Sequence, residues 1–129
     1  MNALAKRLVA CKHFYWMPGM KTSKGEIVLR VFPSRAEDLP VGHLCQLETS
    51  DGYILGCIYP SLTDPGTLGC LLALVAEVYG VTLDDVHVVR TTGMVWSVWI
   101  FRADGSSYRP ATHESSRAEA LVAALEAAQ

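Results

Sequence analysis

The sequence predicts an α+β fold: an antiparallel sheet of about five strands, a buried central helix, and one helix at each end of the chain. Helix signals stand at the start, middle and end of the sequence, and runs rich in β-branched and aromatic residues lie between them. Asp-Gly or Thr-Gly pairs separate several of these runs, which indicates hairpins and hence antiparallel pairing. A length of 129 residues, half of them hydrophobic, fits a single domain over 1–129.

The first helix is expected over about 3–13, with Asn2 as its N-cap. Apolar residues recur at helical spacing along one side of this segment. The other side carries Lys6, Arg7 and Lys12. The sequence therefore predicts an amphipathic helix whose solvent face is basic.

Three strands are expected next. Residues 26–32 alternate in polarity, and Pro33 ends this strand because proline lacks the N–H donor of a β-ladder. Residues 43–48 and 53–59 flank the segment 49–52, which ends in Asp-Gly, a strong hairpin signal.

The central helix is expected between Asp64 and Gly80. Asp64 fits the N-cap, Pro65 fits the first helical position, and Gly80 stands where a left-handed C-cap is expected. Between them the chain is apolar on nearly all sides, and Glu77 is its only charge. A helix of this composition is predicted to be buried on several sides, at the centre of the core.

Two strands, 86–91 and 94–102, are expected to form a second hairpin, followed by a short strand over 107–109 that Pro110 closes. The apolar residues of 94–102 alternate only imperfectly, so both faces of that strand are expected to be covered.

The last helix is expected to begin near Ser115 or Ser116 and to run to the C-terminus. Ser116 and Glu119 match a capping box, in which each side chain accepts a hydrogen bond from the other residue's backbone N–H.

Charge is distributed unevenly along the chain. Seven of the eleven basic residues lie in the first 35 positions, where Glu26 is the only acid, so this stretch carries +6. The other 94 residues carry four basic and twelve acidic side chains, or −8, which gives the net charge of −2. An uneven charge distribution of this kind indicates which partners the protein could bind, and it does not indicate the fold.

An aromatic segment, 14–20, follows the basic helix directly and is bordered by further cations. Aromatic rings beside cations suit stacking on bases or anchoring in a partner's pocket, whereas the alternative is that these rings simply cover the edge of the core. The residues predicted to bind a partner are Lys6, Arg7, Lys12, Tyr15, Trp16, Lys21 and Lys24.

No catalytic motif, metal site or cofactor site is expected. The four cysteines form no C-x-x-C pair, and free thiols in a reducing compartment are predicted. Cys11 and His13 do not face each other on a helix. His43 and Cys45 share a face on a strand, but no acidic residue is evident to orient the histidine.

No apolar run approaches the roughly 20 residues that span a bilayer. The apolar stretch near the N-terminus is too short for a secretory signal. The sequence therefore predicts a cytoplasmic protein without a membrane partner.

Three short blocks, 16–20, 62–75 and 118–127, resemble small tailed-phage and prophage proteins without an assigned activity. The resemblance implies a compact accessory protein that binds and blocks host machinery, including defence systems. It implies no functional residues.

The function expected first is therefore non-enzymatic: binding to a host protein, as an inhibitor of host nucleic-acid-binding machinery. The alternative is a nucleic-acid-binding module that uses the basic helix and the adjacent aromatics, although the net charge of −2 argues against it. A small cysteine-dependent enzyme ranks third. Pairing into a homodimer is left open.

Overall fold

The structure, a computed structural model, describes residues 2–32, 45–56, 58–91 and 93–128. It confirms the α+β class. The helices are α1 (Asn2–Ala10), α2 (Pro65–Tyr79), the short 3₁₀ helix η1 (Leu83–Asp85) and α3 (Arg117–Ala127). The strands are β1 (Val28–Phe32), β2 (Cys45–Thr49), β3 (Gly52–Gly56), β4 (Val86–Thr91), β5 (Val95–Phe101) and β6 (Ser107–Glu114).

Two compact units make up the chain, Met1–Cys70 and Leu71–Gln129. Each unit contains one three-stranded antiparallel sheet, of order β1-β2-β3 in the first and β4-β5-β6 in the second. The single-domain organisation over 1–129 stays a prediction.

The expected sheet of about five strands is wrong, because the described strands form two separate sheets. A hairpin signal specifies only that two consecutive strands pair. Whether distant hairpins join into one sheet depends on pairings that are remote in sequence, and no local pattern encodes those pairings.

The first helix, α1, is amphipathic as predicted. Leu8 and Val9 are buried, whereas Lys6 and Arg7 are exposed. The helix ends at Ala10, three residues before the expected end.

The start and end of α1 differ from the prediction for local reasons. Asn2 lies inside the first turn instead of preceding it as an N-cap. The Cys11 N–H donates to the Leu8 carbonyl three residues back, and the Phe14 N–H does the same to the Cys11 carbonyl. These shorter bonds tighten the chain and end the α-helix.

The first hairpin is confirmed. Thr49 pairs with Gly52, and the Thr49 side chain donates to the Gly52 carbonyl at 2.9 Å and accepts from the Asp51 N–H. Strand β1 is shorter than expected and pairs antiparallel with β2. Residues 43 and 44 of the second expected strand, Pro33 and residue 57 lie outside the described residues.

Both ends of α2 are confirmed. Asp64 caps the N-terminus, and Pro65 is the first helical residue. At the other end Gly80 has φ of 68°, and the Val81 N–H donates to the Ala76 carbonyl at 3.0 Å. This is a Schellman ending, which requires the left-handed conformation that glycine adopts without strain.

The expectation of a buried central helix is wrong. Leu71, Leu74 and Val75 are fully buried, but Leu72 and Val78 are only half-buried. An apolar composition on every side does not determine how many neighbours a helix receives, and much of any protein surface is apolar. The buried side of α2 is therefore a single stripe.

The second sheet has the expected β4 and β5, but β6 is longer than predicted. It continues through Pro110 to Glu114 and forms an edge of the sheet. Proline is tolerated on an edge strand because the N–H that it lacks can face away from the ladder. The register between β5 and β6 shifts twice, and His113 has φ of 59°, as at a β-bulge.

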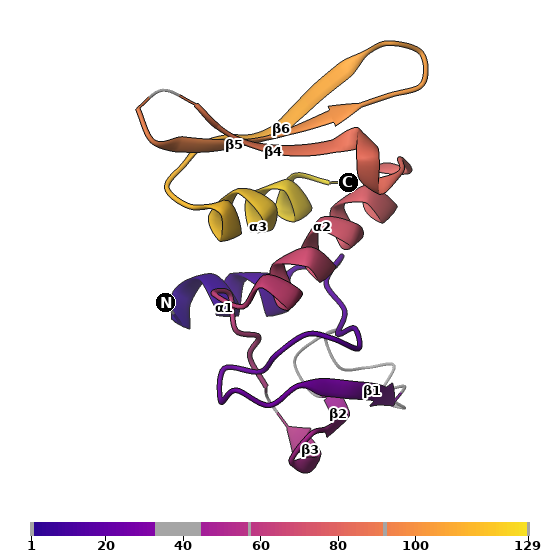
Figure 1. The fold of residues 1–129 in the computed structure, drawn as a ribbon, viewed down its shortest axis with the longest axis vertical. Coiled ribbons are helices and arrows are strands. Elements are labelled where there is room, and N and C mark those ends of the chain that lie inside the picture. The colour runs from indigo at the N-terminus through magenta and orange to yellow at the C-terminus, as the bar shows by residue number, and fades with distance from the viewer. Residues whose placement is uncertain (1, 33–44, 57, 92, 129) are drawn as a thin grey trace. The chain divides into compact units, whose positions relative to one another are not determined.

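Helix α3 covers one face of the second sheet (Figure 1). The Ser116 half of the predicted capping box is confirmed, because the Ser116 side chain accepts from the Glu119 N–H at 3.1 Å; the hydrogen bonds of the described residues do not include the reciprocal bond to the Glu119 carboxylate. The Tyr79 hydroxyl at the end of α2 donates to the Ala124 carbonyl of α3 at 2.8 Å. The helix buries Ala118, Ala120, Leu121, Val122, Ala124 and Leu125.

No helix in the described part of the chain is both long enough and apolar enough to cross a membrane.

Candidate recognition surfaces

The exposed cations predicted near the N-terminus lie in the first unit. Lys6, Lys12 and Lys24 are exposed and make no ion pair with any described residue. Arg7 is also exposed. With Tyr15, which is 40% exposed, five of the seven predicted partner-binding residues thus present their side chains at the surface.

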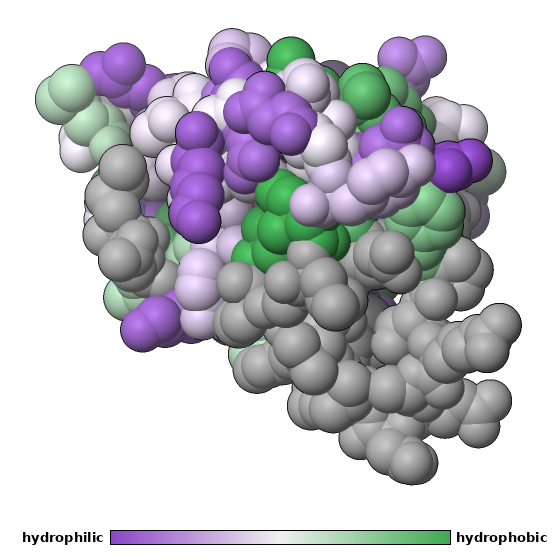
Figure 2. Space-filling view, turned by 90° about the horizontal axis from the view of Figure 1, so that it is seen from below, coloured by the Kyte–Doolittle hydropathy of each residue, from purple (hydrophilic) through white to green (hydrophobic). Residues whose placement is uncertain are grey.

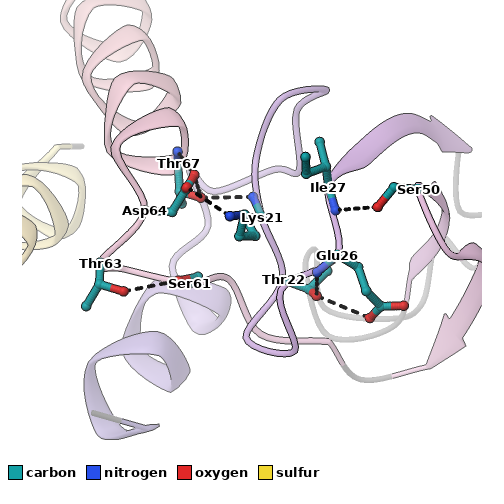
Figure 3. Close-up of polar contacts among 9 residues, drawn as sticks. All are labelled: Lys21, Thr22, Glu26, Ile27, Ser50, Ser61, Thr63, Asp64 and Thr67. Carbon is teal, nitrogen blue, oxygen red and sulfur yellow. Dashed lines mark hydrogen bonds and ion pairs between the residues drawn. The ribbon is translucent and has the colours of Figure 1, made fainter.

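Lys21, by contrast, belongs to a polar cluster at the start of α2 (Figure 3). Its ammonium lies 3.6 Å from Asp64, and its backbone N–H donates to the Thr67 hydroxyl at 2.9 Å. Asp64 accepts from the Thr67 N–H at 2.9 Å, which is the main cause of its lowered pKa. Lys21 therefore contributes to the fold, and its ammonium is already paired with Asp64.

A second early cation is also engaged. Arg30 pairs with Glu48 at 3.3 Å, and its guanidinium lies 4.5 Å from the centre of the Phe32 ring. Later acids thus neutralise two of the early cations, Lys21 and Arg30. Arg35 lies outside the described residues.

The aromatic segment after α1 packs mainly into the core. Phe14 and Met20 are fully buried and Trp16 is 4% exposed, with the Phe14 and Trp16 rings in edge contact at 5.6 Å. The burial of Trp16 removes it from the predicted surface, and its indole N–H makes no hydrogen bond to a residue that the structure describes. Tyr15, at 40% exposure, is the ring of this segment that remains accessible.

Lys24 borders a depression of about 300 Å³ beside the turn 22–26. The Thr22 hydroxyl at this turn is buried, and it donates to the Glu26 carboxylate and accepts from the Glu26 N–H, each at 3.2 Å (Figure 3). Figure 2 shows one face of the molecule, on which hydrophobic and hydrophilic residues lie side by side. Lys24 is exposed at the edge of the depression.

A different surface lies on the second sheet, on the face opposite α3. We call it the aromatic strip, and it consists of His87, Val89, Trp99, Phe101 and Arg109. Alternate residues of a strand share a face, which places Trp99 beside Phe101 on β5. Register pairs His87 of β4 directly with Trp99.

The rings of the aromatic strip contact one another. Trp99 and Phe101 lie 6.2 Å apart, 14° from parallel, and His87 meets Phe101 edge-on at 5.0 Å. The Arg109 guanidinium lies 4.8 Å from the centre of the Trp99 ring. The rings and Val89 line an open depression of about 260 Å³.

The strip remains accessible. Phe101 is 40% exposed, His87 and Arg109 are exposed, and Trp99 is half-buried. Within the described residues, no hydrogen bond or ion pair engages the side chains of His87, Trp99 or Arg109. Their N–H groups are thus available to a partner.

Sequence reasoning missed the strip because it expected both faces of β5 to be covered. A period-two signal was present: Trp99 and Phe101 are two apart, and so are His87 and Val89 on the neighbouring strand. Helix α3 covers one face of the sheet, and the aromatic face carries exposed residues.

The thiols provide no evident nucleophile among the described side chains. Cys11 is buried, and burial raises the pKa of the half-buried Cys70 thiol, with a further contribution from the Asp64 charge. A raised pKa lowers the fraction of reactive thiolate at neutral pH. His43 and Cys57, and the side chain of Cys45, lie outside the described residues.

Among the side chains that the structure describes, no group of three or more His, Cys, Asp or Glu residues is placed to hold a metal ion. Comparison of the chain with family models, curated proteins and solved structures gave no match.

Proposed function

We propose that this chain is a non-enzymatic binding protein that holds a protein partner on the aromatic strip. The observation that carries the proposal is that the half-buried Trp99 and the exposed Phe101 and Arg109 lie together on one sheet face. Tryptophan and arginine dominate the energetic centres of protein interfaces, and interface cores are rich in aromatic residues.

The open shape of the depression, more than its volume, fits this role better than it fits a substrate site. Pockets that enclose a small-molecule ligand measure roughly 300–1,000 Å³. The depression on the strip measures about 260 Å³ and is open. It suits one or two side chains of a partner.

Charge also supports a protein partner. The second unit carries four basic and seven acidic side chains, a net of −3, and the whole chain carries −2. A polyanionic nucleic acid is repelled by such an excess, since its binding is driven mainly by contacts between cations and phosphates.

The partner that we propose is a host protein, and the effect that we propose is inhibition of host nucleic-acid-binding machinery. The resemblance of three sequence blocks to small phage proteins supports a host protein as the partner. The acidic excess of the second unit supports the proposed inhibition, because an acidic surface is complementary to a basic nucleic-acid-binding surface.

A second candidate is nucleic-acid binding by the first unit, favoured by Lys6, Lys12 and Lys24, which are exposed and form no ion pair with a described residue. A gel shift with random DNA and RNA at about 50 mM salt tests it, because phosphate contacts are strongest at low salt. Binding that weakens in a Lys6→Gln, Lys12→Gln double variant supports this candidate, and no retention at low salt removes it.

Capture of partners from a bacterial lysate tests the leading proposal. We expect a protein to be retained by the wild type and lost with Trp99→Ala. Tyr53→Ala is the matched control, because Tyr53 is 67% exposed and lies on the first sheet. Equal retention by wild type and Trp99→Ala contradicts the proposal.

A further inference from the structure

The depression beside the turn 22–26 is a candidate ligand site within the first unit. It measures about 300 Å³ and is more enclosed than the depression on the aromatic strip. We call it the turn pocket, and its lining includes Thr22, Lys24, Glu26, Ile54, Ile58 and Tyr59. Its volume equals that of about ten molecules of liquid water, at roughly 30 Å³ each, so a ligand of roughly ten non-hydrogen atoms fits.

The backbone around the turn pocket is held in place by hydrogen bonds. The Thr22 N–H donates to the Glu26 carbonyl at 2.8 Å, and the Gly25 N–H donates to the Thr22 carbonyl at 2.9 Å. The Ser23 N–H donates to the Tyr59 carbonyl at 2.8 Å, which joins the turn to the segment that carries Tyr59. Binding to a site that is already formed requires little ordering of the protein.

Two opposite charges line the turn pocket without pairing. Lys24 is exposed and Glu26 is half-buried, and the structure shows no ion pair between them or with another described residue. The buried Thr22 hydroxyl donates to one Glu26 oxygen at 3.2 Å and so orients the carboxylate (Figure 3). Within the described residues, the second Glu26 oxygen and the Lys24 ammonium have no partner, and a ligand that carries both charges would satisfy them.

Much of the remaining lining of the turn pocket is apolar. Ile58 is buried, and Ile54 and Tyr59 are half-buried. Contact with an apolar group of a ligand would remove the exposed part of these side chains from water, which is favourable. Because Lys24 and Glu26 lie two positions apart in one tight turn, a fitting ligand combines this apolar group with a positive and a negative group that are close together.

We propose that the turn pocket binds a free α-amino acid with a large apolar side chain, a role separate from the binding of a protein partner on the aromatic strip. The carboxylate of the amino acid pairs with Lys24, and its ammonium pairs with Glu26. Its side chain contacts the apolar lining. Leucine and phenylalanine have roughly ten non-hydrogen atoms, which is the size that the pocket holds.

Ligands with one kind of charge suit the turn pocket less well. A simple carboxylic acid would cover Glu26 without offering it a counter-charge, and a simple amine would do the same to Lys24. A charge that loses water without gaining a partner is unfavourable. A nucleic-acid phosphate would in addition be repelled by the Glu26 carboxylate. In an α-amino acid both charged groups are attached to one carbon, so one small molecule can satisfy both residues.

Titration of the full chain with L-phenylalanine, followed by the backbone amide signals in the NMR spectrum, tests the proposal. The signals of Ser23 and Gly25 should shift, whereas that of Gly105, an exposed turn glycine of the second unit, should stay in place. We expect a Kd of about 1 mM or below. The absence of a shift at Ser23 and Gly25 with about 10 mM L-phenylalanine, well above that Kd, refutes the proposal.

Three control ligands each lack one part of this probe. Phenylpropionate lacks the ammonium, L-phenylalaninamide lacks the carboxylate, and glycine lacks the apolar side chain. We expect each to bind at least about tenfold more weakly than L-phenylalanine, a difference of about 1.4 kcal/mol. Equal affinity for L-phenylalaninamide, which mimics the first residue of a peptide, would assign the pocket to a peptide N-terminus and overturn the proposal. Equal affinity for phenylpropionate would exclude the contact with Glu26 and overturn it as well.

Variants assign the two charged contacts. Lys24→Gln should weaken binding of L-phenylalanine at least about tenfold and leave the affinity for L-phenylalaninamide unchanged. Glu26→Gln keeps an acceptor for the Thr22 hydroxyl and should remove most of the preference for L-phenylalanine over phenylpropionate. Lys12→Gln is the matched control, because Lys12 is an exposed cation of the same unit that is not part of the pocket lining, and it should bind like the wild type.

The test does not depend on every variant being folded. Lys24 is exposed, so Lys24→Gln should keep the circular dichroism spectrum of the wild type, and these two proteins decide the matter if Glu26→Gln does not fold. Binding of L-phenylalanine that Lys24→Gln leaves unchanged overturns the proposal. The turn pocket and the aromatic strip share no residue, so Trp99→Ala should bind L-phenylalanine like the wild type, and failure of either proposal leaves the other standing.

Discussion

Replacing Asp64 by Ala removes the contacts that hold the start of α2 to the preceding chain. The Asp64 carboxylate accepts from the Thr67 N–H at 2.9 Å and from the Thr67 hydroxyl at 3.1 Å, and it lies 3.6 Å from the Lys21 ammonium. The first two contacts form an N-cap, and the third is a partly exposed ion pair.

The expected cost follows from these two components. Loss of an N-cap costs about 0.5–2 kcal/mol, and a partly exposed ion pair contributes about 0.2–1 kcal/mol. Asp64→Ala should therefore lower the free energy of unfolding by about 1–3 kcal/mol. Asp64→Asn keeps a cap acceptor and loses only the charge, so it should cost less than about 1 kcal/mol.

Urea denaturation followed by circular dichroism measures these differences. The pKa of Asp64 is lowered in the fold, chiefly by the Thr67 N–H bond and despite partial desolvation. A depressed folded-state pKa gives stability that is present above the unfolded value, 3.8, and is lost as the pH falls through the folded value. The gap between wild type and Asp64→Ala should thus shrink in acid. Equal costs for Asp64→Ala and Asp64→Asn, or a gap that does not change with pH, would refute this reasoning.

Three further predictions concern the helices and one thiol. Tyr79→Phe removes the hydroxyl that donates to Ala124 and should cost about 0.5–1.5 kcal/mol in the same assay. Burial raises the pKa of Tyr79 to about 12 from 10.0, so the wild type should lose stability as the pH rises from 10 towards 12 because only the unfolded state ionises; an equal loss in Tyr79→Phe contradicts this. Ser116→Ala should cost about 0.5–2 kcal/mol through loss of the α3 cap, while the exposed neighbour variant Ser115→Ala should change stability by less than about 0.5 kcal/mol. Cys70 should react with iodoacetamide at pH 7 more slowly than a free cysteine peptide, because its pKa is raised; reaction as fast as the peptide's would exclude that cause.

Features with a local physical cause could be predicted from the sequence. The Asp64 cap, the left-handed Gly80, the turn 49–52 and the Ser116 cap each depend on residues only a few positions apart. Each also has one dominant solution, such as glycine where φ is positive. These features fixed the ends of elements correctly.

Features that depend on distant contacts could not be predicted. The separation into two sheets depends on whether β3 pairs with any strand beyond α2. The continuation of β6 through Pro110 depends on its position at a sheet edge. The half-burial of Leu72 and Val78 depends on which neighbours the helix receives.

The same distinction holds for the candidate sites. The basic face of α1 followed from helical periodicity, and Lys6 and Arg7 lie on it as expected. Composition could not show that Trp16 is buried, since that depends on packing. The meeting of Trp99 with Arg109, ten positions away on another strand, depends on the irregular register between β5 and β6.

The most direct test of a binding role for the aromatic strip is calorimetric titration of a captured partner with wild type, Trp99→Ala and Tyr53→Ala. If the half-buried Trp99 lies at the centre of the interface, the affinity should be at least about tenfold weaker for Trp99→Ala and unchanged for Tyr53→Ala. An affinity that Trp99→Ala leaves unchanged, in a variant shown to be folded, would contradict it.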